Sequence, residues 1–167
     1  MAVPVLVAAL AYAAWRGRRL VPPVVCAAAM AAVPAVVSPL KAAIGRAGPG
    51  SLALAPGYPG LYPSGHTATA SVAYGAAALL LIPFVRRASV RLGLVAGTVL
   101  LNLMVGVALV YCGYHWPLDV AGSWLMCGAL LSCAACVIFG SMGSLRSSSS
   151  SSDGSASSEN CSSGSRG

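Results

Sequence analysis

The side chains able to transfer a proton are few in this chain, and most of them lie in two short stretches. Histidine occurs twice, as His66 in "PSGHTATA" and as His115 in "YHWPLDVAG". Two of the three acidic residues belong to a serine-rich segment near the end of the chain, which leaves Asp119 as the one carboxylate of the apolar part. Lys41 and Arg46 add two cations in "KAAIGRAGP". These residue types together indicate proton transfer or nucleophilic attack on an anionic group.

The Pro-Ser-Gly-His stretch at residues 63–66 directly precedes a long apolar segment. Ser64 is of a type that caps a helix N-terminus, and Gly65 lets the backbone approach a ligand closely. The free N–H groups of a first helical turn, together with the helix dipole, form a site for an anion. The stretch therefore predicts an anion-binding turn with the imidazole of His66 in reach.

The second stretch places Asp119 four residues after His115, about one helical turn further on. Pro117 suits the first turn of a helix. Asp119 could therefore accept the Nδ1–H of His115 and leave Nε2 free for attack. Two histidines and one acid are also a possible metal-ligand set, but the cations and the helix-start site fit phosphate better, so no metal is predicted.

Long apolar segments must position these residues. The chain has 167 residues, of which 57% are hydrophobic and 8% charged, and its mean hydropathy is +0.81. A water-soluble surface needs far more charge. Apolar blocks at residues 2–15, 20–40, 67–85, 92–111 and 120–142 predict an all-α, polytopic transmembrane bundle of about five spans. The first block, about 21 Å long as a helix, is short for a bilayer core of about 30 Å. It is either tilted, or distorts the bilayer, or is the remainder of a longer segment.

Ten cationic and three acidic residues give the net charge of +7, and six of the cations are arginines in clusters between the apolar blocks, at residues 16, 18, 19, 86, 87 and 91. This pattern is typical of cytoplasmic loops, and it argues against a nucleic-acid partner. The first cluster follows its apolar block, which is the wrong order for a secretory signal and favours an outside amino terminus. The topology predicts a multi-pass plasma-membrane protein with both histidines on the outer face.

Residues 1–143 are expected to form the transmembrane domain and residues 144–167 a disordered, cytoplasmic Ser/Gly-rich tail, because that segment is too polar to build a core. Gly93 and Gly97 form a GxxxG pair, which predicts close helix packing, and Asn102 is expected to bond a neighbouring helix.

The motifs resemble those of the type 2 phosphatidic acid phosphatase family, whose site is shared with vanadium haloperoxidases. That family's pattern has three parts: Lys, six residues and Arg-Pro; Pro-Ser-Gly-His; and Ser-Arg, five residues, His, three residues and Asp. The first part begins here at Lys41, the second is intact at residues 63–66, and the third is present as His115 and Asp119.

The chain departs from the family pattern at two places. The arginine of the first part falls on Gly48, and Arg46, two residues earlier, is the candidate substitute. The Ser-Arg of the third part falls on Ala108 and Leu109, so one phosphate-binding arginine is missing.

The resemblance implies a metal-independent phosphatase without a cofactor. His115, oriented by Asp119, would attack phosphorus, His66 would protonate the leaving oxygen, and water would then hydrolyse the phosphohistidine. The phosphate would be held by Lys41, Arg46, Ser64 and the backbone of Gly65.

The expected substrate is an amphiphile with its phosphate at the outer leaflet. Phosphatidic acid, phosphatidylglycerol phosphate and undecaprenyl pyrophosphate, that is, a lipid phosphate or a polyprenyl pyrophosphate, all fit the sequence. Two alternatives stay open: a membrane protein that binds lipid phosphate without turnover, and a phosphotransferase that uses the same site. The sequence leaves the oligomeric state open.

Overall fold

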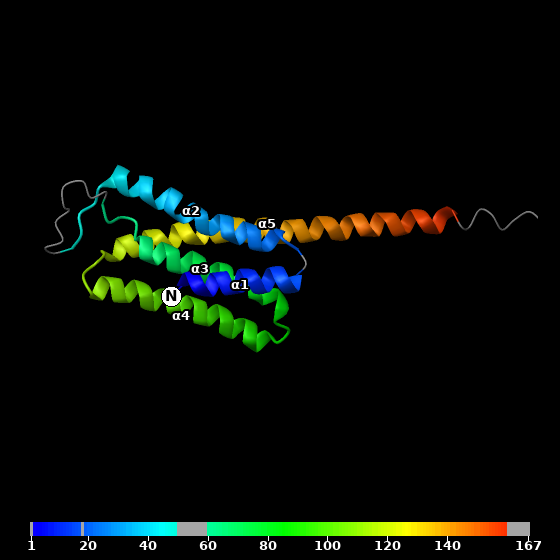
Figure 1. Ribbon diagram of the computed structural model, residues 1–167, viewed down its shortest axis with the longest axis horizontal. Coiled ribbons are helices and arrows are strands. Elements are labelled where there is room, and N and C mark those ends of the chain that lie inside the picture. Colours follow the sequence, from blue (N-terminus) through cyan, green and yellow to red (C-terminus); the bar gives the residue numbers. More distant parts are fainter. Residues whose placement is uncertain (1, 18, 50–59, 160–167) are drawn as a thin grey trace, which may run out of the picture.

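A computed structural model describes residues 2–17, 19–49 and 60–159, with side chains as far as Ser141. Within these residues the chain forms five α-helices and no strand, which confirms the all-α bundle (Figure 1). The helices are α1 (Ala2–Gly17), α2 (Val21–Ile44), α3 (Gly65–Leu81), α4 (Ala88–Tyr111) and α5 (Pro117–Glu159). A short 3₁₀ turn, η1 (Ile82–Phe84), follows α3.

Four helices are long and apolar enough to cross a membrane: Val21–Ile44, Gly65–Phe84, Ala88–Tyr111 and Pro117–Ser141. α1 is apolar but has only 16 residues. A helix of that length is about 24 Å long, less than the hydrocarbon thickness of about 30 Å. The described part of the bundle therefore has four full-length spans and one short helix.

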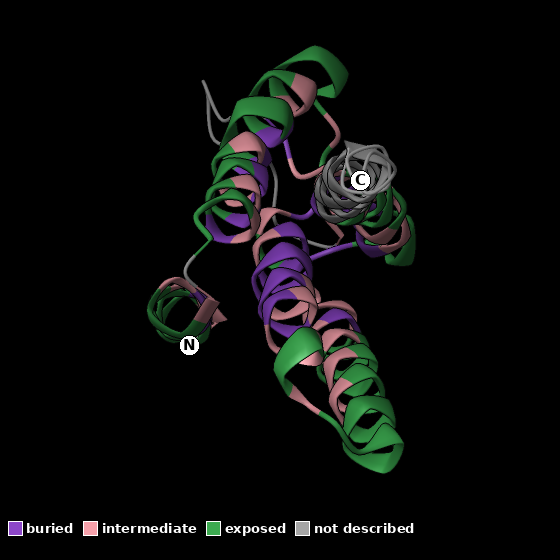
Figure 2. Ribbon diagram, turned by 90° about the vertical axis from the view of Figure 1, so that its right-hand side faces the viewer, coloured by how far each residue is buried: buried purple, intermediate pink, exposed green. Residues whose placement is uncertain are grey.

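α3 lies at the centre of the bundle and packs against α1, α2, α4 and α5 (Figure 2). In its most apolar window 56% of the residues are buried, compared with 6% for α4. Small residues such as Ala68, Ala73 and Ala76 let neighbouring helices approach closely. Gly75 is the closest case, since a Cβ there would lie 2.4 Å from Leu131 Cδ1 of α5. The central helix is therefore the most buried of the four spans, and the Pro-Ser-Gly-His stretch forms its N-terminus.

The two ends of the bundle differ in chemistry. The α1–α2 and η1–α4 connections lie at one end (Figure 1). Arg16 is in the last turn of α1, and the connections themselves carry Arg19, Arg86 and Arg87. The C-terminus of α2, the N-terminus of α3 and the α4–α5 turn lie at the other end. The candidate residues of the two sequence stretches are thus on the same end of the bundle, opposite the arginines.

α5 is described as a helix through Glu159, beyond the apolar span that ends at Ser141. The disorder expected of the Ser/Gly-rich segment from residue 144 stays a prediction. Figure 1 shows this part of α5 extending well beyond the other helices. Residues 160–167 lie outside the described part.

Two expectations for α4 differ from the structure. A Cβ placed on Gly93 or Gly97 meets nothing within 4 Å, so these glycines do not mediate close helix packing. The Asn102 amide donates to Thr98 O of its own helix at 2.9 Å rather than to a neighbouring helix. Spacing along one helix identifies a possible contact face, but which face meets a neighbour depends on the packing of the whole bundle.

Candidate active site

The Pro-Ser-Gly-His stretch forms the N-terminus of α3, as its residue types predict. Ser64 is the N-cap, and its Oγ accepts a hydrogen bond from Thr67 N at 3.3 Å. The Thr67 hydroxyl adds a second bond to the same oxygen at 3.0 Å, and both side chains are fully buried. The N–H groups of Gly65 and His66 have no acceptor among the described residues. The first turn therefore offers two backbone donors to an anion.

Ser123 joins this turn to the start of α5. Its Oγ lies 2.8 Å from Asp119 O and 3.0 Å from Ser64 O, and the side chain is fully buried. Ser64 N also donates to Asp119 O at 3.3 Å. The backbones of the two sequence stretches are thus held against each other directly and through one hydroxyl group.

The Asp119 carboxylate is fully buried and receives three donors. Its Oδ2 lies 3.4 Å from His115 Nδ1 and accepts the Trp116 backbone N–H at 3.1 Å. Its Oδ1 accepts from Arg46 Nη1 at 3.1 Å. A buried carboxylate is costly unless its charge is paired and hydrogen-bonded, and this one is both. Because Nδ1 of His115 faces the carboxylate, Nε2 is the ring nitrogen left for chemistry.

His115 lies in the α4–α5 turn, outside the spans, and its side chain is 5% exposed. Its backbone N–H donates to Leu109 O at 3.3 Å, which ties the turn to the last turn of α4. Burial lowers the pKa of the imidazole below its ordinary value of 6.5, while hydrogen bonding to and the charge of Asp119 oppose the shift. The positive charges of Lys41 and His66 lower the pKa further. The neutral form of His115 is therefore favoured near pH 7.

Arg46 follows the C-terminus of α2, and its side chain contacts Asp119 and Trp116 of the site. Its side chain is 35% exposed, and its guanidinium carbon lies 6.0 Å from the centroid of the Trp116 ring. The Trp116 indole N–H in turn donates to Ala47 O at 3.2 Å. The ion pair and the aromatic contact together dock this loop on the start of α5.

The backbone at Gly60 packs against the end of α2 and the start of this loop, and Gly60 has φ +105°. A Cβ at Gly60 would lie 2.9 Å from Lys41 O, so only glycine fits this approach. The next residue, Leu61, donates its N–H to Arg46 O at 2.9 Å. The end of α2 is thus fixed beside the segment that enters α3.

Lys41, Gly65 and His66 line a cavity of about 740 Å³ next to this network. Lys41 is half-buried and His66 is exposed. The structure thus divides the expected site residues into two adjoining groups. Arg46, Ser64, His115 and Asp119 belong to the buried hydrogen-bonded network, and the other three border the cavity. Ser64 and Gly65, neighbours in the chain, connect the two groups.

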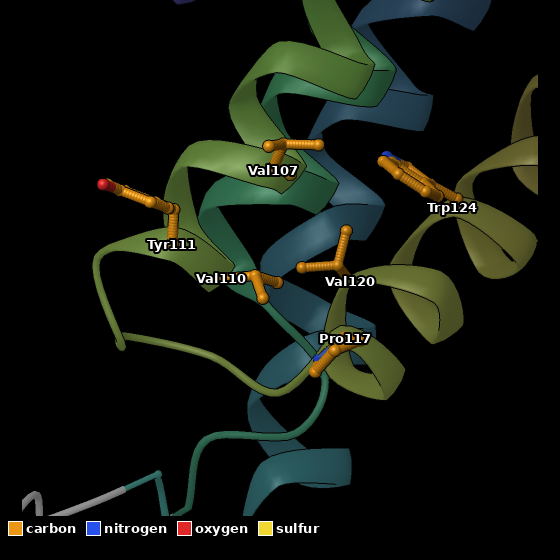
Figure 3. A pocket seen from close by; sticks show the side chains of 7 residues that line it. Val107, Val110, Tyr111, Pro117, Val120 and Trp124 are labelled. Atoms are coloured by element: carbon orange, nitrogen blue, oxygen red, sulfur yellow. The ribbon is translucent and has the colours of Figure 1, made fainter.

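A second cavity near the site, of about 350 Å³, lies between α4 and α5 (Figure 3). Val110, Val120 and Trp124 line it, with Gly106 at its wall. No charged side chain borders it, so it is not suited to a phosphate group. In the described part of the chain, no three His, Cys, Asp or Glu side chains are grouped to hold a metal ion.

Sequence reasoning did not single out Ser123 or the role of Trp116. Ser123 lies four residues after Asp119, on the same face of α5, and this spacing was the available signal. Trp116 is next to His115, and its contact with Ala47 joins residues 69 apart in the chain. No local pattern predicts a contact of that kind.

Comparison with known proteins identifies the family of the chain. A family model described as the PAP2 superfamily matches residues 22–142. The matched range includes both sequence stretches and the four full-length spans, apart from Val21, the first residue of α2. No curated protein and no solved structure matches the chain. The chain therefore belongs to the PAP2 superfamily, the family of type 2 phosphatidic acid phosphatases, and is a phosphatase-type integral membrane protein.

Proposed function

We propose that the protein is a metal-independent phosphatase that hydrolyses a lipid phosphate or a polyprenyl pyrophosphate through a phosphohistidine intermediate. The observation that carries this proposal is the buried Asp119 carboxylate beside Nδ1 of His115. It fixes the imidazole with Nε2 free and stabilises the positive charge that develops on the ring during attack.

The reaction has two steps. The Nε2 lone pair of His115 attacks the terminal phosphorus, and the bond from phosphorus to the leaving oxygen breaks as His66 donates its proton to that oxygen. The leaving oxygen belongs to the lipid alcohol of a monophosphate or is the bridging oxygen of a pyrophosphate. Water then attacks the phosphohistidine while His66 accepts one of its protons. Inorganic phosphate leaves, neutral His115 is restored and His66 is protonated again. The exposed position of His66 on the cavity wall suits a group that must meet both the leaving lipid and water.

Cations and backbone donors would stabilise the phosphate oxygens. Lys41 borders the cavity with His66, and the N–H groups of Gly65 and His66 point from the start of α3. One nitrogen of the Arg46 guanidinium binds Asp119, and the group has further N–H donors for an oxygen of the substrate. Ser64 contributes by capping the helix that presents these donors.

The outer face of the membrane is the proposed location of the reaction, with α5 ending in the cytoplasm. This follows from the arginine-bearing connections at the opposite end of the bundle, because such clusters remain in the cytoplasm. The substrate phosphate would then lie at the headgroup level of the outer leaflet.

A second candidate function is the binding of lipid phosphate without turnover. Leu109 stands where the family pattern has an arginine, and Arg46 is already paired with Asp119. Losing one donor to the transition state can reduce turnover by about 10²–10³. The paired His115 and Asp119 favour the phosphatase, because a binding protein has no need for an oriented nucleophile.

The test is phosphate release by detergent-solubilised protein in excess chelator, with phosphatidic acid, phosphatidylglycerol phosphate and undecaprenyl pyrophosphate as substrates. Release by the wild type that is lost in His115→Ala and kept in Arg87→Ala is the expected result. Arg87 is exposed at the other end of the bundle. Absence of release by a folded wild type that still binds vanadate would favour the binding function.

A further inference from the structure

The cavity beside the site continues from its polar end into the membrane span. Lys41 and His66 border it at one end, and Val33 and Val37 of α2 line it further in. It reaches Met30, eleven positions before Lys41, which corresponds to about 16 Å along α2. On α3 it extends from His66 to Tyr74, or about 12 Å. The cavity thus joins a cationic end to a long apolar interior.

A further cavity of about 280 Å³ continues in the same direction between α3 and α4. On α3 its lining passes from Tyr74 to Leu81, and on α4 it includes Leu101 and Gly97. The first cavity meets α4 at Val105, one turn after Leu101 and nearer to the site. The two cavities are therefore arranged end to end along the helix axes.

Tyr74 is the residue that lines both cavities, and it is half-buried. Beyond it, Gly93 and Gly97 leave open space, because a Cβ at either position meets nothing within 4 Å. Tyr74 is therefore shared by the cavity next to the site and the cavity that these glycines line.

Resting on the proposed function, we propose that the first cavity binds the hydrocarbon chain of the substrate and that Tyr74 limits its length. The charge of Lys41 matches the phosphate at one end, and the apolar lining matches the chain. A depth of about 12 Å is close to one leaflet of the hydrocarbon core, about 15 Å. The enzyme therefore selects lipid phosphates whose chain fits one leaflet over polyprenyl chains that continue past Tyr74.

The experiment compares kcat/KM for straight-chain alkyl monophosphates of increasing length and a long polyprenyl monophosphate. Tyr74→Ala joins the two cavities and should raise the long-to-short ratio of kcat/KM about tenfold or more, since each methylene accommodated in an apolar pocket contributes substantially. Tyr74→Phe keeps the ring and should leave the ratio unchanged. Adding Gly97→Leu to Tyr74→Ala fills the second cavity and should reverse the gain. Tyr74→Val replaces Tyr74→Ala in this comparison if the alanine variant does not fold.

An unchanged ratio in Tyr74→Ala and Tyr74→Val, with phosphate still released, would overturn this inference and leave the proposed function intact. If the wild type releases no phosphate from any substrate, the proposed function fails instead. The inference is then tested by thermal unfolding with non-hydrolysable alkyl phosphonates of the same lengths. The inference is supported if the long-chain phosphonate raises the Tm of Tyr74→Ala more than it raises the Tm of the wild type. Equal increases in the two proteins contradict the inference.

Discussion

Arg46 and Asp119 are 73 residues apart in the chain, yet Arg46 Nη1 lies 3.1 Å from Asp119 Oδ1. The pair joins the loop after α2 to the first turn of α5, and it uses the carboxylate oxygen that does not face His115. Arg46 therefore has two effects: it neutralises a buried charge, and it places a guanidinium next to the candidate nucleophile.

Arg46→Ala should lower both stability and turnover. Removing the guanidinium leaves a fully buried carboxylate with one donor fewer, and we expect a loss of about 1–3 kcal/mol, since Arg46 itself is partly exposed. Unfolding in detergent measures the loss, and phosphate release measures kcat/KM. Arg87→Ala is the matched control. Equal stability of the two variants would show that the ion pair is not structural.

The imidazole of His115 should titrate below 6.5, because burial disfavours its charged form. Its neutral, nucleophilic form then persists above that lowered pKa, and kcat/KM should fall only as the pH decreases through it. In His66→Gln the one remaining histidine is His115, so imidazole NMR of that variant reports its titration directly. A midpoint at or above 6.5 would contradict the lowering of the His115 pKa by burial.

Ser123→Ala should loosen the junction between the starts of α3 and α5. The hydroxyl lies within hydrogen-bonding distance of Asp119 O and Ser64 O, and its loss should cost about 0.5–1.5 kcal/mol. Because the two functional turns then shift relative to each other, kcat should fall more than KM rises. Ser132→Ala removes an exposed hydroxyl that bonds only within α5, and it should behave as the wild type. A KM effect alone would contradict the positioning role of Ser123.

Leu109→Arg restores the cation that the family pattern has at this position. Leu109 lies at the end of α4, and its carbonyl accepts the backbone N–H of His115. A guanidinium directed to the phosphate should raise kcat/KM about tenfold, a fraction of what a transition-state donor contributes. Leu109→Met is the control for side-chain length. No gain over the methionine variant would show that Arg46 and Lys41 already supply the charge that the site needs.

The apolar blocks were sufficient to predict the helices, because the length and hydropathy of a span are properties of local sequence. The helix boundaries differ from those of the predicted apolar blocks where a capping residue or a charged residue lies near the end of a block. α3 begins at Gly65 because Ser64 caps it, and α4 begins at Ala88, before Arg91 rather than after it. Charged residues near the end of a span are compatible with helix, so hydropathy alone places such boundaries poorly.

The candidate site was predictable in its local parts only. The spacing of His115 and Asp119 is one helical turn, and the structure places the two side chains together. The pairing of Arg46 with Asp119 and the hydroxyl of Ser123 between two backbones depend on how α2, α3 and α5 pack. Gly97 shows the converse, since its motif predicts a contact and the structure has open space there.

The most direct test of the mechanism is to trap the phosphorylated enzyme. Wild-type protein is mixed with substrate labelled in the transferred phosphate, quenched in alkali, where phosphohistidine is stable, and digested for mass spectrometry. The label should lie on the peptide that contains His115, and it should be absent in His115→Ala. Release of phosphate by the wild type with label on no residue, or on a residue other than His115, would contradict the account.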